Sequence, residues 1–427
     1  MQIYELICEL ASFKKYSVIC SMKPRILIIG LVWPEPTSSA AGWRMLQLID
    51  QLLQWTDAIH FASAATKSTA SYPLNKLSVT EHEIVLNDSS FNDFVSDLKP
   101  DVVVYDRFVT EEQFGWRVKQ VFPELITVLD TEDLHFVRRA RAVAFKNQTD
   151  IDYDTPDCYR ELSAMYRCDL SLIISDVEYN LLVNHFNIPE KQLLYLPFIE
   201  KELSVEIQKK IPGYSDRQHV MFIGNFIHEP NYQTVLQLKR IWAALKKRLP
   251  QTELHIYGAY PPEKVYQLHN VSDRFFIKGK AINVDETMQK YRVLTAPIPF
   301  GAGLKGKFVD GFKNGLPNVT TAMGCEGMNA ENWGGLIAEN DECFIEAVCR
   351  LYTDETIWQQ SVTNGFEIIN EKFADKIWNG VLEKAIMRIL KNPLEHRNKL
   401  IVQKILWQNS LQATKYMSLW IEQKNNK

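Results

Sequence analysis

Residues 297–328 read PIPFGAGLKGKFVDGFKNGLPNVTTAMGCEGM, and three successive parts of this stretch predict local structure. Residues 300–307 form a turn of small residues that also carries two lysines, and small residues let the backbone approach a bulky anion closely. Residues 307–312 have the pattern of the first turns of a helix, whose outward-pointing amides attract anions. Residues 315–321 predict the end of that helix and a short apolar strand.

The charged side chains of this stretch indicate which anion it suits. Lys307 and Asp310 are three residues apart, so they share one face of the expected helix. Amides with Lys305 and Lys307 suit a pyrophosphate, and a carboxylate one turn further along suits ribose hydroxyls. We therefore predict that the stretch binds a nucleoside diphosphate. The other residues of the turn that we assign to this site are Gly301, Gly303 and Leu304. The spacing leaves open the alternative of an ordinary glycine-rich turn between a strand and a helix.

The order of these pieces resembles the donor-binding segment of the group 1 (family 4) glycosyltransferases. That pattern runs Pro, a Gly-Ala-Gly turn, Lys, two residues, Glu, and then Gly-x-Pro-Val-Val; here Asp310 stands at the glutamate and Asn318 at a valine. The resemblance covers roughly residues 24–373. It implies an α/β chain with the GT-B fold, in which two Rossmann-like, doubly wound domains face a cleft.

The resemblance also implies an activity. The family's enzymes are hexosyltransferases that move a sugar from a nucleoside-diphosphate donor to a glycan, lipid-linked or other acceptor. We expect retention of configuration and no metal or other cofactor, because Lys305 and Lys307 would take the part of a metal and the nucleotide sugar is itself a substrate. Two alternatives remain, namely a nucleotide-sugar epimerase or hydrolase on the same fold, and a non-catalytic relative that binds a nucleotide sugar.

Length and charge bound the architecture. A chain of 427 residues exceeds what one hydrophobic core usually serves, so two domains are expected. With the resemblance, the predicted parts are an N-terminal extension (1–23), an acceptor-side domain (24–198), a linker (199–218), a donor domain (219–385) and C-terminal helices that pack back on the first domain (386–427). The mild net charge of −4 argues against general binding of nucleic acid.

Cysteine usage and apolar runs indicate a cytoplasmic protein. The seven cysteines are odd in number and widely spaced, which favours reduced thiols over disulfides or zinc. No apolar run reaches the roughly 18 residues of a membrane-spanning helix, and acids precede the lysines at the N-terminus, the wrong order for a signal peptide. Beyond His396 the chain is basic, with Trp407, Tyr416 and Trp420 interleaved. This part either docks peripherally on the inner face of a membrane or packs on its own protein.

The first predicted strand, 25–31, is a continuous apolar run of the kind that is buried in a parallel sheet. The loop after it contains Ser, Ala and Gly but no G-x-G-x-x-G, which argues against a nicotinamide enzyme. In the family this loop faces the cleft, so the resemblance makes Gly42 and Arg44 candidates for contact with the sugar or its phosphates. The alternative for Arg44 is a solvated position on a helix.

Further predicted strands alternate with helices, which indicates a doubly wound parallel sheet; they are 58–62, 83–86, 101–105, 125–129 and 170–175. Ligands of such sheets lie beyond the carboxyl ends of the strands. VLDTEDLHFVRRAR, at one of these ends, resembles an Asp-x-x-Asp-Leu-His pattern in one subgroup of the family, which implies that Asp130, Asp133 and His135 are catalytic. The alternative is an aspartate that caps the next helix. Ser175 and Glu178 have the spacing of a capping box, so we expect both to be architectural.

The second domain is predicted to begin with the strand 219–226. FIGNFIHEPN is similar to the opening of the family's donor domain in its version without a basic residue, which makes Gly224 and Asn225 candidates for donor binding. Glu326 follows the last strand predicted within residues 297–328, here called the key stretch, where the family also has Glu-Gly. It either contacts sugar hydroxyls or holds the loop in place.

Overall fold

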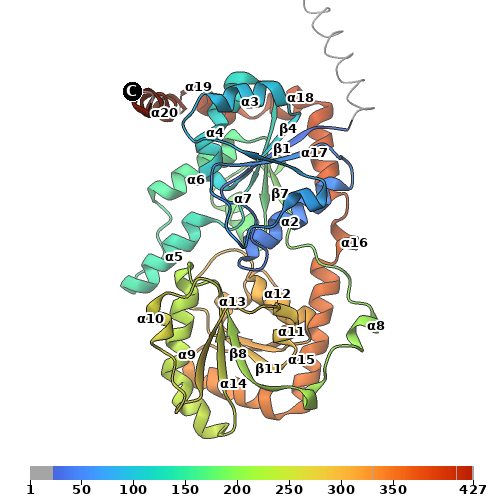
Figure 1. Cartoon of the computed structure of the whole chain (residues 1–427), viewed down its shortest axis with the longest axis vertical. Coiled ribbons are helices and arrows are strands. Elements are labelled where there is room, and N and C mark those ends of the chain that lie inside the picture. Colours follow the sequence, from blue (N-terminus) through green and yellow to red (C-terminus); the bar gives the residue numbers. More distant parts are fainter. Residues whose placement is uncertain (1–22, 330, 410, 426–427) are drawn as a thin grey trace, which may run out of the picture.

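The computed structural model describes residues 23–329, 331–409 and 411–425, and each of its two α/β domains is built on a parallel sheet (Figure 1). The predicted N-terminal extension lies outside the described residues except for Lys23. The first sheet has the strand order β3-β2-β1-β4-β5-β6-β7, with parallel neighbours throughout. Its strands are β1 (Ile26–Gly30), β2 (Ile59–Ser63), β3 (Thr80–Glu83), β4 (Val102–Asp106), β5 (Ile126–Asp130), β6 (Leu170–Ile173) and β7 (Leu193–Tyr195).

The second sheet has the order β10-β9-β8-β11-β12-β13 and is also parallel. Its strands are β8 (Gln218–Ile223), β9 (Leu254–Tyr257), β10 (Phe275–Gly279), β11 (Tyr291–Ala296), β12 (Asn318–Thr320) and β13 (Gly335–Ile337). Both sheets follow from apolar runs that are buried on two faces. The doubly wound α/β fold class predicted from the sequence is confirmed.

Helices cover both faces of each sheet because parallel strands must be joined by crossover connections. The first domain contains α2 (Ala40–Leu53), η1 (Leu74–Leu77), α3 (Ser90–Leu98), α4 (Arg107–Val121), α5 (His135–Asn147), α6 (Pro156–Arg167), α7 (Asp176–Asn184) and η2 (Glu190–Gln192). After α8 (Val205–Gln208) and η3 (Tyr214–Asp216), the second contains α9 (Glu229–Arg248), α10 (Glu263–Tyr266), α11 (Val284–Met288), α12 (Gly306–Lys313), α13 (Ala322–Cys325), α14 (Asp341–Thr353) and α15 (Glu355–Ile368).

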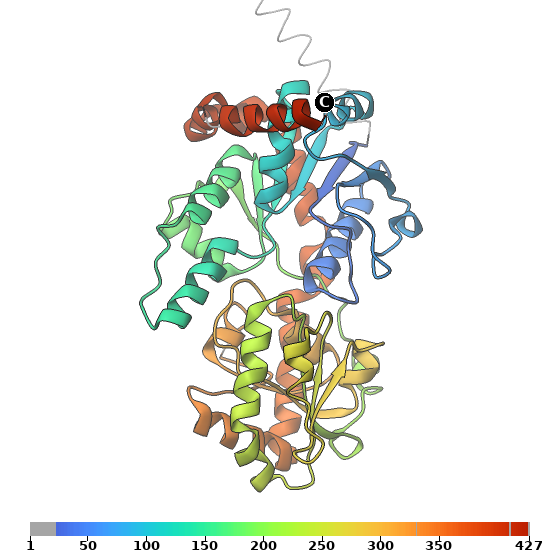
Figure 2. The same cartoon turned by 60° about the vertical axis from the view of Figure 1, so that its left-hand side comes forward.

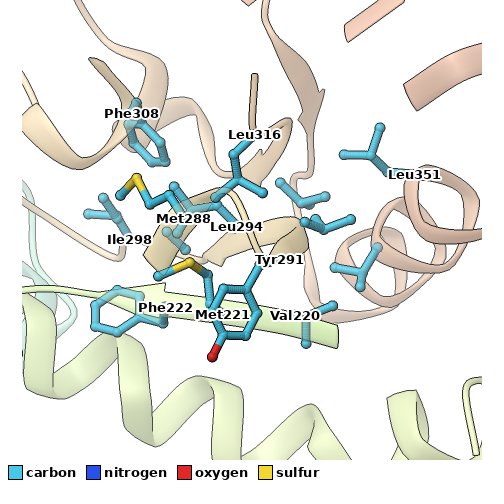
Figure 3. Close-up of a cluster of buried hydrophobic side chains, with 14 of the residues drawn as sticks. Val220, Met221, Phe222, Met288, Tyr291, Leu294, Ile298, Phe308, Leu316 and Leu351 are labelled. Atoms are coloured by element: carbon cyan, nitrogen blue, oxygen red, sulfur yellow. The ribbon is translucent and has the colours of Figure 1, made fainter. Parts of the chain in front are cut away.

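The core of the second domain lies on both sides of β8 and β11. Figure 3 shows Met221 and Phe222 of β8, Leu294 of β11 and Phe308 of α12 converging in one cluster, and all four side chains are fully buried. This packing fixes the start of α12 against the sheet, so the turn before that helix is held at the carboxyl ends of the strands.

The edge strand β3 differs from the prediction, which put a strand at 83–86. The observed strand is Thr80–Glu83, and it pairs with β2 from His60↔Thr80 to Ser63↔Glu83. Its side chains are polar and none of them is fully buried. A short, charged edge strand is held by backbone hydrogen bonds on one side only, so it does not need the apolar pattern on which the prediction relied.

The chain passes between the domains twice, and the two passages are hydrogen-bonded to each other. The amide of Glu200 donates to the carbonyl of Phe373 at 2.7 Å, and the amide of Asp375 donates to the carbonyl of Glu200 at 2.8 Å. The second passage consists of the π-helical turn η4 (Ile369–Phe373) and α16 (Asp375–Trp378). The buried Glu200 carboxylate also accepts from Trp43 Nε1 of α2 at 2.9 Å and pairs with Lys313 of α12 at 2.8 Å.

The chain ends with four helices on the first domain, α17 (Val381–Lys391), α18 (Pro393–Asn398), α19 (Ile401–Asn409) and α20 (Leu411–Asn425). Helix α17 packs with α2 on one face of the first sheet through Leu382 and Ile386. Arg397 of α18 binds the fully buried Asp169 with two hydrogen bonds of 2.7 Å. Within the described ranges no helix is long and apolar enough to cross a membrane.

Candidate functional site

The loop at 301–306 of the second domain lies directly against the first domain. The amide of Gly303 donates a hydrogen bond of 2.7 Å to Glu178 Oε1 of α7. Gly303 has a φ of +58°, and a Cβ atom added to it would lie 2.7 Å from Cβ of Asp133. At Gly306 an added Cβ would lie 3.0 Å from Cβ of Ala40. The turn needs small residues because the first domain approaches its backbone closely and because Gly303 has a left-handed conformation.

Lys305 is buried on the second-domain side of this contact. Its Nζ donates to the carbonyl of Gly303 at 2.9 Å. Burial lowers the pKa of Lys305, and the carboxylates of Glu326 and Glu178 oppose the shift. The neighbouring Leu304 is buried in the core of the second domain and Gly301 is buried too, so these two predicted residues shape the turn.

Lys307 is half-buried in the first turn of α12 and donates to Asn231 Oδ1 at 2.8 Å. Burial, with the nearby charge of Lys305, lowers its pKa to about 7. An anion bound beside both ammonium groups would relieve this repulsion. Among the described residues no side chain caps the N-terminus of α12, so its amides are available to the same anion.

Carboxylates gather where β4 and β5 end. Asp106, Asp130 and Glu132 are buried, and each has one oxygen without a hydrogen-bond partner among the described residues. Burial raises the pKa of Asp106, and it raises the pKa of Glu132 to about 8. The charge of Asp130 adds to both shifts, whereas Arg107 opposes them. Arg107 and Glu132 also have positive φ values of 70° and 62°, and backbone strain of this kind concentrates at functional sites.

Arg44 and Asp130 form a buried pair, which corrects the alternative of a solvated position for Arg44. Its Nε and Nη2 donate to Asp130 Oδ1 at 3.1 and 2.9 Å, and its Nη1 donates to the carbonyl of Leu196 at 2.9 Å. The two side chains are 1% and 0% exposed. Arg44 is therefore not solvated, Asp130 is equally enclosed, and contact of Arg44 with the sugar or its phosphates stays a prediction. The pair joins α2 to the ends of β5 and β7.

Asp133 and His135 lie at the start of α5, where groups of both domains meet. Burial acts to raise the pKa of Asp133, but Arg138, His135 and His228 outweigh it, and the pKa is lowered. Arg138 hydrogen-bonds Asp133 directly, and His135 Nε2 lies 3.6 Å from Asp133 Oδ1. Burial lowers the pKa of His135 to about 3, so its imidazole is neutral at pH 7 and can donate or accept a hydrogen bond.

His228, at the start of α9, brings the second domain to this group. The surrounding protein and the cation of Arg138 lower its pKa, Asp133 opposes the shift, and Lys307 contributes to lowering it. The pKa of His228 thus depends both on Asp133, the predicted catalytic aspartate of the first domain, and on Lys307, the predicted phosphate-binding lysine of the second.

The α5 N-terminus is held by acids from two other helices. Glu161 of α6 accepts from the amides of His135 at 3.2 Å and Phe136 at 2.9 Å. Glu178 of α7 accepts from the amide of Leu134 at 3.2 Å. The predicted capping box at Ser175 and Glu178 is wrong, because Ser175 makes no side-chain capping bond and Glu178 accepts from the amides of Leu134 and Gly303. Glu178 therefore binds amides that are distant in sequence, those of Leu134 and Gly303, and not the amide of Ser175 at the start of its own helix.

Glu326 holds its loop through an arginine of the other domain. Arg141 of α5 donates to both carboxylate oxygens, at 2.7 and 3.0 Å, and to the carbonyl of Gly301 at 2.8 Å. Of the two roles predicted for Glu326, the geometry is that of holding the loop. The bidentate pair fixes both ends of the key stretch to the first domain.

A polar chain links Lys307 to the loop after β1. Asn231, the acceptor of Lys307, donates to the carbonyl of Asn225 at 2.7 Å, and Asn225 donates to the carbonyl of Ser38 at 3.0 Å. A Cβ on Gly224 would lie 2.6 Å from Cγ of Asn231, so glycine is needed for this packing. Gly42 plays a similar part in the first domain, because an added Cβ would lie 2.5 Å from the backbone of Glu35.

Asp310 lies near the passage between the domains. Its Oδ1 is 3.8 Å from Lys313 Nζ, and Lys313 also pairs with Glu200. Burial raises the pKa of Asp310 to about 7, and Lys313 opposes the shift. The side chain remains 37% exposed, so it is accessible to a ligand.

Several residues of this site were not predicted, namely Arg107, Arg138, Arg141, Glu178 and His228. The only signal available for Arg138 and Arg141 was the basic run at 138–141 in α5, and nothing in the run indicated which arginine faces the second domain. Within the described ranges no group of three or more His, Cys, Asp or Glu side chains is arranged to hold a metal.

Comparison with known proteins agrees with this architecture. A family model described as "Glycosyl transferases group 1" matches residues 217–354. Over 172 residues, 37% of this chain, the sequence is 26% identical to an "Uncharacterized 44.6 kDa protein in cps region" of Klebsiella pneumoniae, and the match spans 43% of that protein, less than half its length.

Two solved structures show the extent of the fold. Sucrose-phosphate synthase from Thermosynechococcus elongatus has a TM-score of 0.63 at 14% identity, covering 86% of this chain and 99% of that one. HepE from Anabaena, in complex with UDP and glucose, has a TM-score of 0.63 at 11% identity, covering 85% and 99%. The resemblance stated from the sequence is confirmed. Residues 217–354 match the model of the group 1 glycosyltransferases, and the chain has the GT-B fold of two Rossmann-like α/β domains.

Proposed function

We propose that the protein transfers a hexose from a nucleoside-diphosphate sugar to a glycan or lipid-linked acceptor, with retention and without a metal. The observation that supports this most strongly is the pair Lys305 and Lys307 beside the uncapped N-terminus of α12, directly after the turn at Gly303 that contacts the first domain. Two crowded cations and free amides suit the charge that develops on a departing diphosphate.

The donor would lie with its diphosphate on Lys305, Lys307 and the α12 amides, and with its ribose towards Asp310. HepE is described in complex with UDP and glucose, so UDP-glucose is the first donor to test. The chain Lys307, Asn231, Asn225 would orient the ammonium group, and Lys280, which donates to Ser38 Oγ at 3.0 Å, lies where the two domains meet beyond it.

The acceptor side would be formed by Asp133 and His135. The imidazole of His135 is neutral, so in this proposal it hydrogen-bonds a sugar hydroxyl, while Arg138 keeps Asp133 ionised beside it. Asp130 would act only by positioning, since Arg44 encloses it. The bond from the anomeric carbon to the diphosphate oxygen would then break, the acceptor oxygen would bond to that carbon on the same face of the sugar, and the departing diphosphate would take the hydroxyl proton.

The test compares wild type, Lys307→Met and the matched control Lys247→Met, an exposed lysine at the far end of α9. Each protein is incubated with nucleoside-diphosphate sugars, with and without a panel of glycan and lipid-linked acceptors. We expect acceptor-dependent release of the diphosphate by wild type and the control, and a loss of at least about 100-fold in kcat/KM for Lys307→Met. Full activity of Lys307→Met would contradict the proposal, and conversion of donor alone into a new sugar would identify an epimerase instead.

A further inference from the structure

The last two helices expose apolar side chains and bury polar ones, which reverses the usual arrangement of a surface helix. On α19, Ile401, Val402 and Ile405 are 66%, 44% and 51% exposed, and their spacing puts them on one face. On the opposite face the buried Gln403 donates to the carbonyl of Arg167 at 3.1 Å and to Asp169 Oδ1 at 3.2 Å.

Helix α20 repeats the same pattern. Tyr416, Met417 and Trp420 are 62%, 64% and 60% exposed and again share one face. The opposite face carries the buried Ser418 and the partly buried Glu422, which accept from Arg117 Nη2 at 3.4 and 3.1 Å. Polar contacts thus attach both helices to the first domain, and two large apolar stripes are left outside. Exposed apolar surface of this kind marks an interaction site.

The charge around these stripes is strongly positive. Residues 376–427 contain ten lysines and arginines against three glutamates, whereas residues 1–375 contain 38 against 49 acidic residues. The exposed lysines of the last helices include Lys399, Lys404 and Lys424. The net charge of −4 for the whole chain conceals this separation into an acidic body and a basic end.

A pocket of about 550 Å³ adds to the same basic region. Lys191, Lys384 and Arg388 line it, together with Glu190 and residues of β7 and α7. Lys191 Nζ donates to the carbonyl of His396 at 2.7 Å, which puts the pocket beside α18. Burial lowers the pKa of Lys191, and the charges of Lys399 and Lys404 add to the shift, so the pocket and the last helices form one electrostatic region.

We propose that α19 and α20 dock on the surface of an anionic lipid bilayer. The stripes Ile401-Val402-Ile405 and Tyr416-Met417-Trp420 enter the boundary between headgroups and acyl chains, and the lysines face lipid phosphates. A second copy of the chain is a poor occupant, because it would bring two strongly basic faces together. In both views the two helices lie at the outer end of the first domain, away from the second domain, so docking leaves the candidate site free (Figures 1 and 2).

The experiment is sedimentation of the full chain with vesicles of phosphatidylcholine alone or with phosphatidylglycerol added. Ile405→Ser with Trp420→Ser removes the centres of both stripes, and Val271→Ser, at a 66% exposed position of the second domain, is the matched control. Lys404→Glu with Lys424→Glu reverses charge, with Lys247→Glu as its control. We expect binding to the anionic vesicles only, weakened by salt, and a loss of affinity of about tenfold or more for each double variant but not for either control.

Three results would overturn the proposal. The first is that the wild-type chain fails to bind anionic vesicles. The second is that the double variants bind as well as their controls. The third is that light scattering without lipid shows a wild-type dimer which Ile405→Ser with Trp420→Ser dissociates, because a second copy would then cover the stripes. All of these measurements are independent of transferase activity, so failure of the proposed reaction would leave the inference untouched.

Discussion

Glu178 of the first domain binds the amide of Gly303 of the second at 2.7 Å, and the same oxygen accepts from the amide of Leu134 at 3.2 Å. One buried carboxylate therefore joins the lysine-bearing loop to the start of the helix that carries His135. Burial and the charge of Asp133 raise the pKa of Glu178 to about 7, and the two amide hydrogen bonds oppose the rise. The loop at Gly303 and the start of α5 are thus joined through a single side chain.

Gly303→Ala should disable the site without unfolding the domains. The new Cβ would lie 2.7 Å from Cβ of Asp133, and the φ of +58° would strain any other residue. We expect kcat/KM to fall by about 100-fold, with a small change in Tm. The control Gly213→Ala meets only Asp216 Oδ2 at 3.7 Å and should behave as wild type. Equal kinetics for the two variants would show that this contact is not needed.

Donor binding should weaken above neutral pH. The pKa of Lys307 is lowered to about 7, so the free protein loses this positive charge as pH rises, whereas a bound diphosphate would hold the proton. The donor Kd should therefore increase between pH 7 and 9, approaching about tenfold per pH unit. Calorimetric titration at several pH values measures this dependence. Lys307→Arg keeps its charge and should flatten the profile; an unchanged slope would assign the titration to another group.

Arg141 and Glu326 should act as one unit in catalysis. Because Arg141 holds both Glu326 and the carbonyl of Gly301, either single substitution releases the key stretch from the first domain. A double-mutant cycle on kcat/KM with Arg141→Met and Glu326→Gln should give a coupling energy of about 1–3 kcal/mol. The exposed pair Arg240–Asp341, at 2.7 Å, lies within the second domain and should show none. If the losses of kcat/KM in the two single variants were additive in the double variant, Arg141 and Glu326 would not act as one unit.

Removing Arg397 should destabilise the first domain strongly. Burial acts to raise the pKa of Asp169, but hydrogen bonding to Arg397 and the charge of Lys119 lower it to about 2. A carboxylate with a lowered pKa stabilises the fold above its ordinary pKa near 4, and that contribution is lost as pH falls towards 2. Arg397→Gln leaves a buried charge unpaired, so we expect a cost of about 3–5 kcal/mol in urea unfolding at pH 7.

Two further variants decide whether Asp169 is the cause. Asp169→Asn combined with Arg397→Gln should recover part of the loss, because the unpaired charge is then gone. Arg248→Gln, which breaks an exposed pair with Glu346, should cost less than about 1 kcal/mol. A similar cost for Arg248→Gln and Arg397→Gln would mean that burial of the pair is unimportant.

Transfer should survive removal of divalent metals. In the proposed reaction Lys305 and Lys307 carry the charge compensation that a metal would otherwise supply. Initial rates should change by less than about twofold when EDTA is added at millimolar excess. A loss that magnesium or manganese restores would instead assign that compensation to a metal.

The sequence predicted those features that depend on local pattern. Continuous apolar runs such as 25–31 indicated buried parallel strands, and the small residues around Gly303 indicated a turn whose backbone is closely approached. The expected neighbour was an anion, and the neighbour found is Asp133 of the first domain. The edge strand β3 was misplaced because its side chains carry no apolar pattern and its position depends on pairing with β2.

Features that depend on distant partners were beyond the sequence. Arg44 pairs with Asp130, which lies 86 residues further along the chain, and no local sequence pattern around either residue indicates that pair. Glu178 fits a capping pattern with Ser175, yet its acceptor oxygen is used by amides 44 and 125 residues away. Charged side chains of this kind are assigned by which elements the fold brings together, and local spacing does not contain that information.

Glu200 has a mechanical consequence. It lies in the first passage of the chain between the domains, its backbone is hydrogen-bonded to the second passage, and its carboxylate binds Trp43 of α2 and Lys313 of α12. The same carboxylate therefore attaches the last residue of α12 to the first domain, while the turn before α12 is attached there through Gly303. Lys307 thus lies on a helix that is fastened to the other domain at both of its ends.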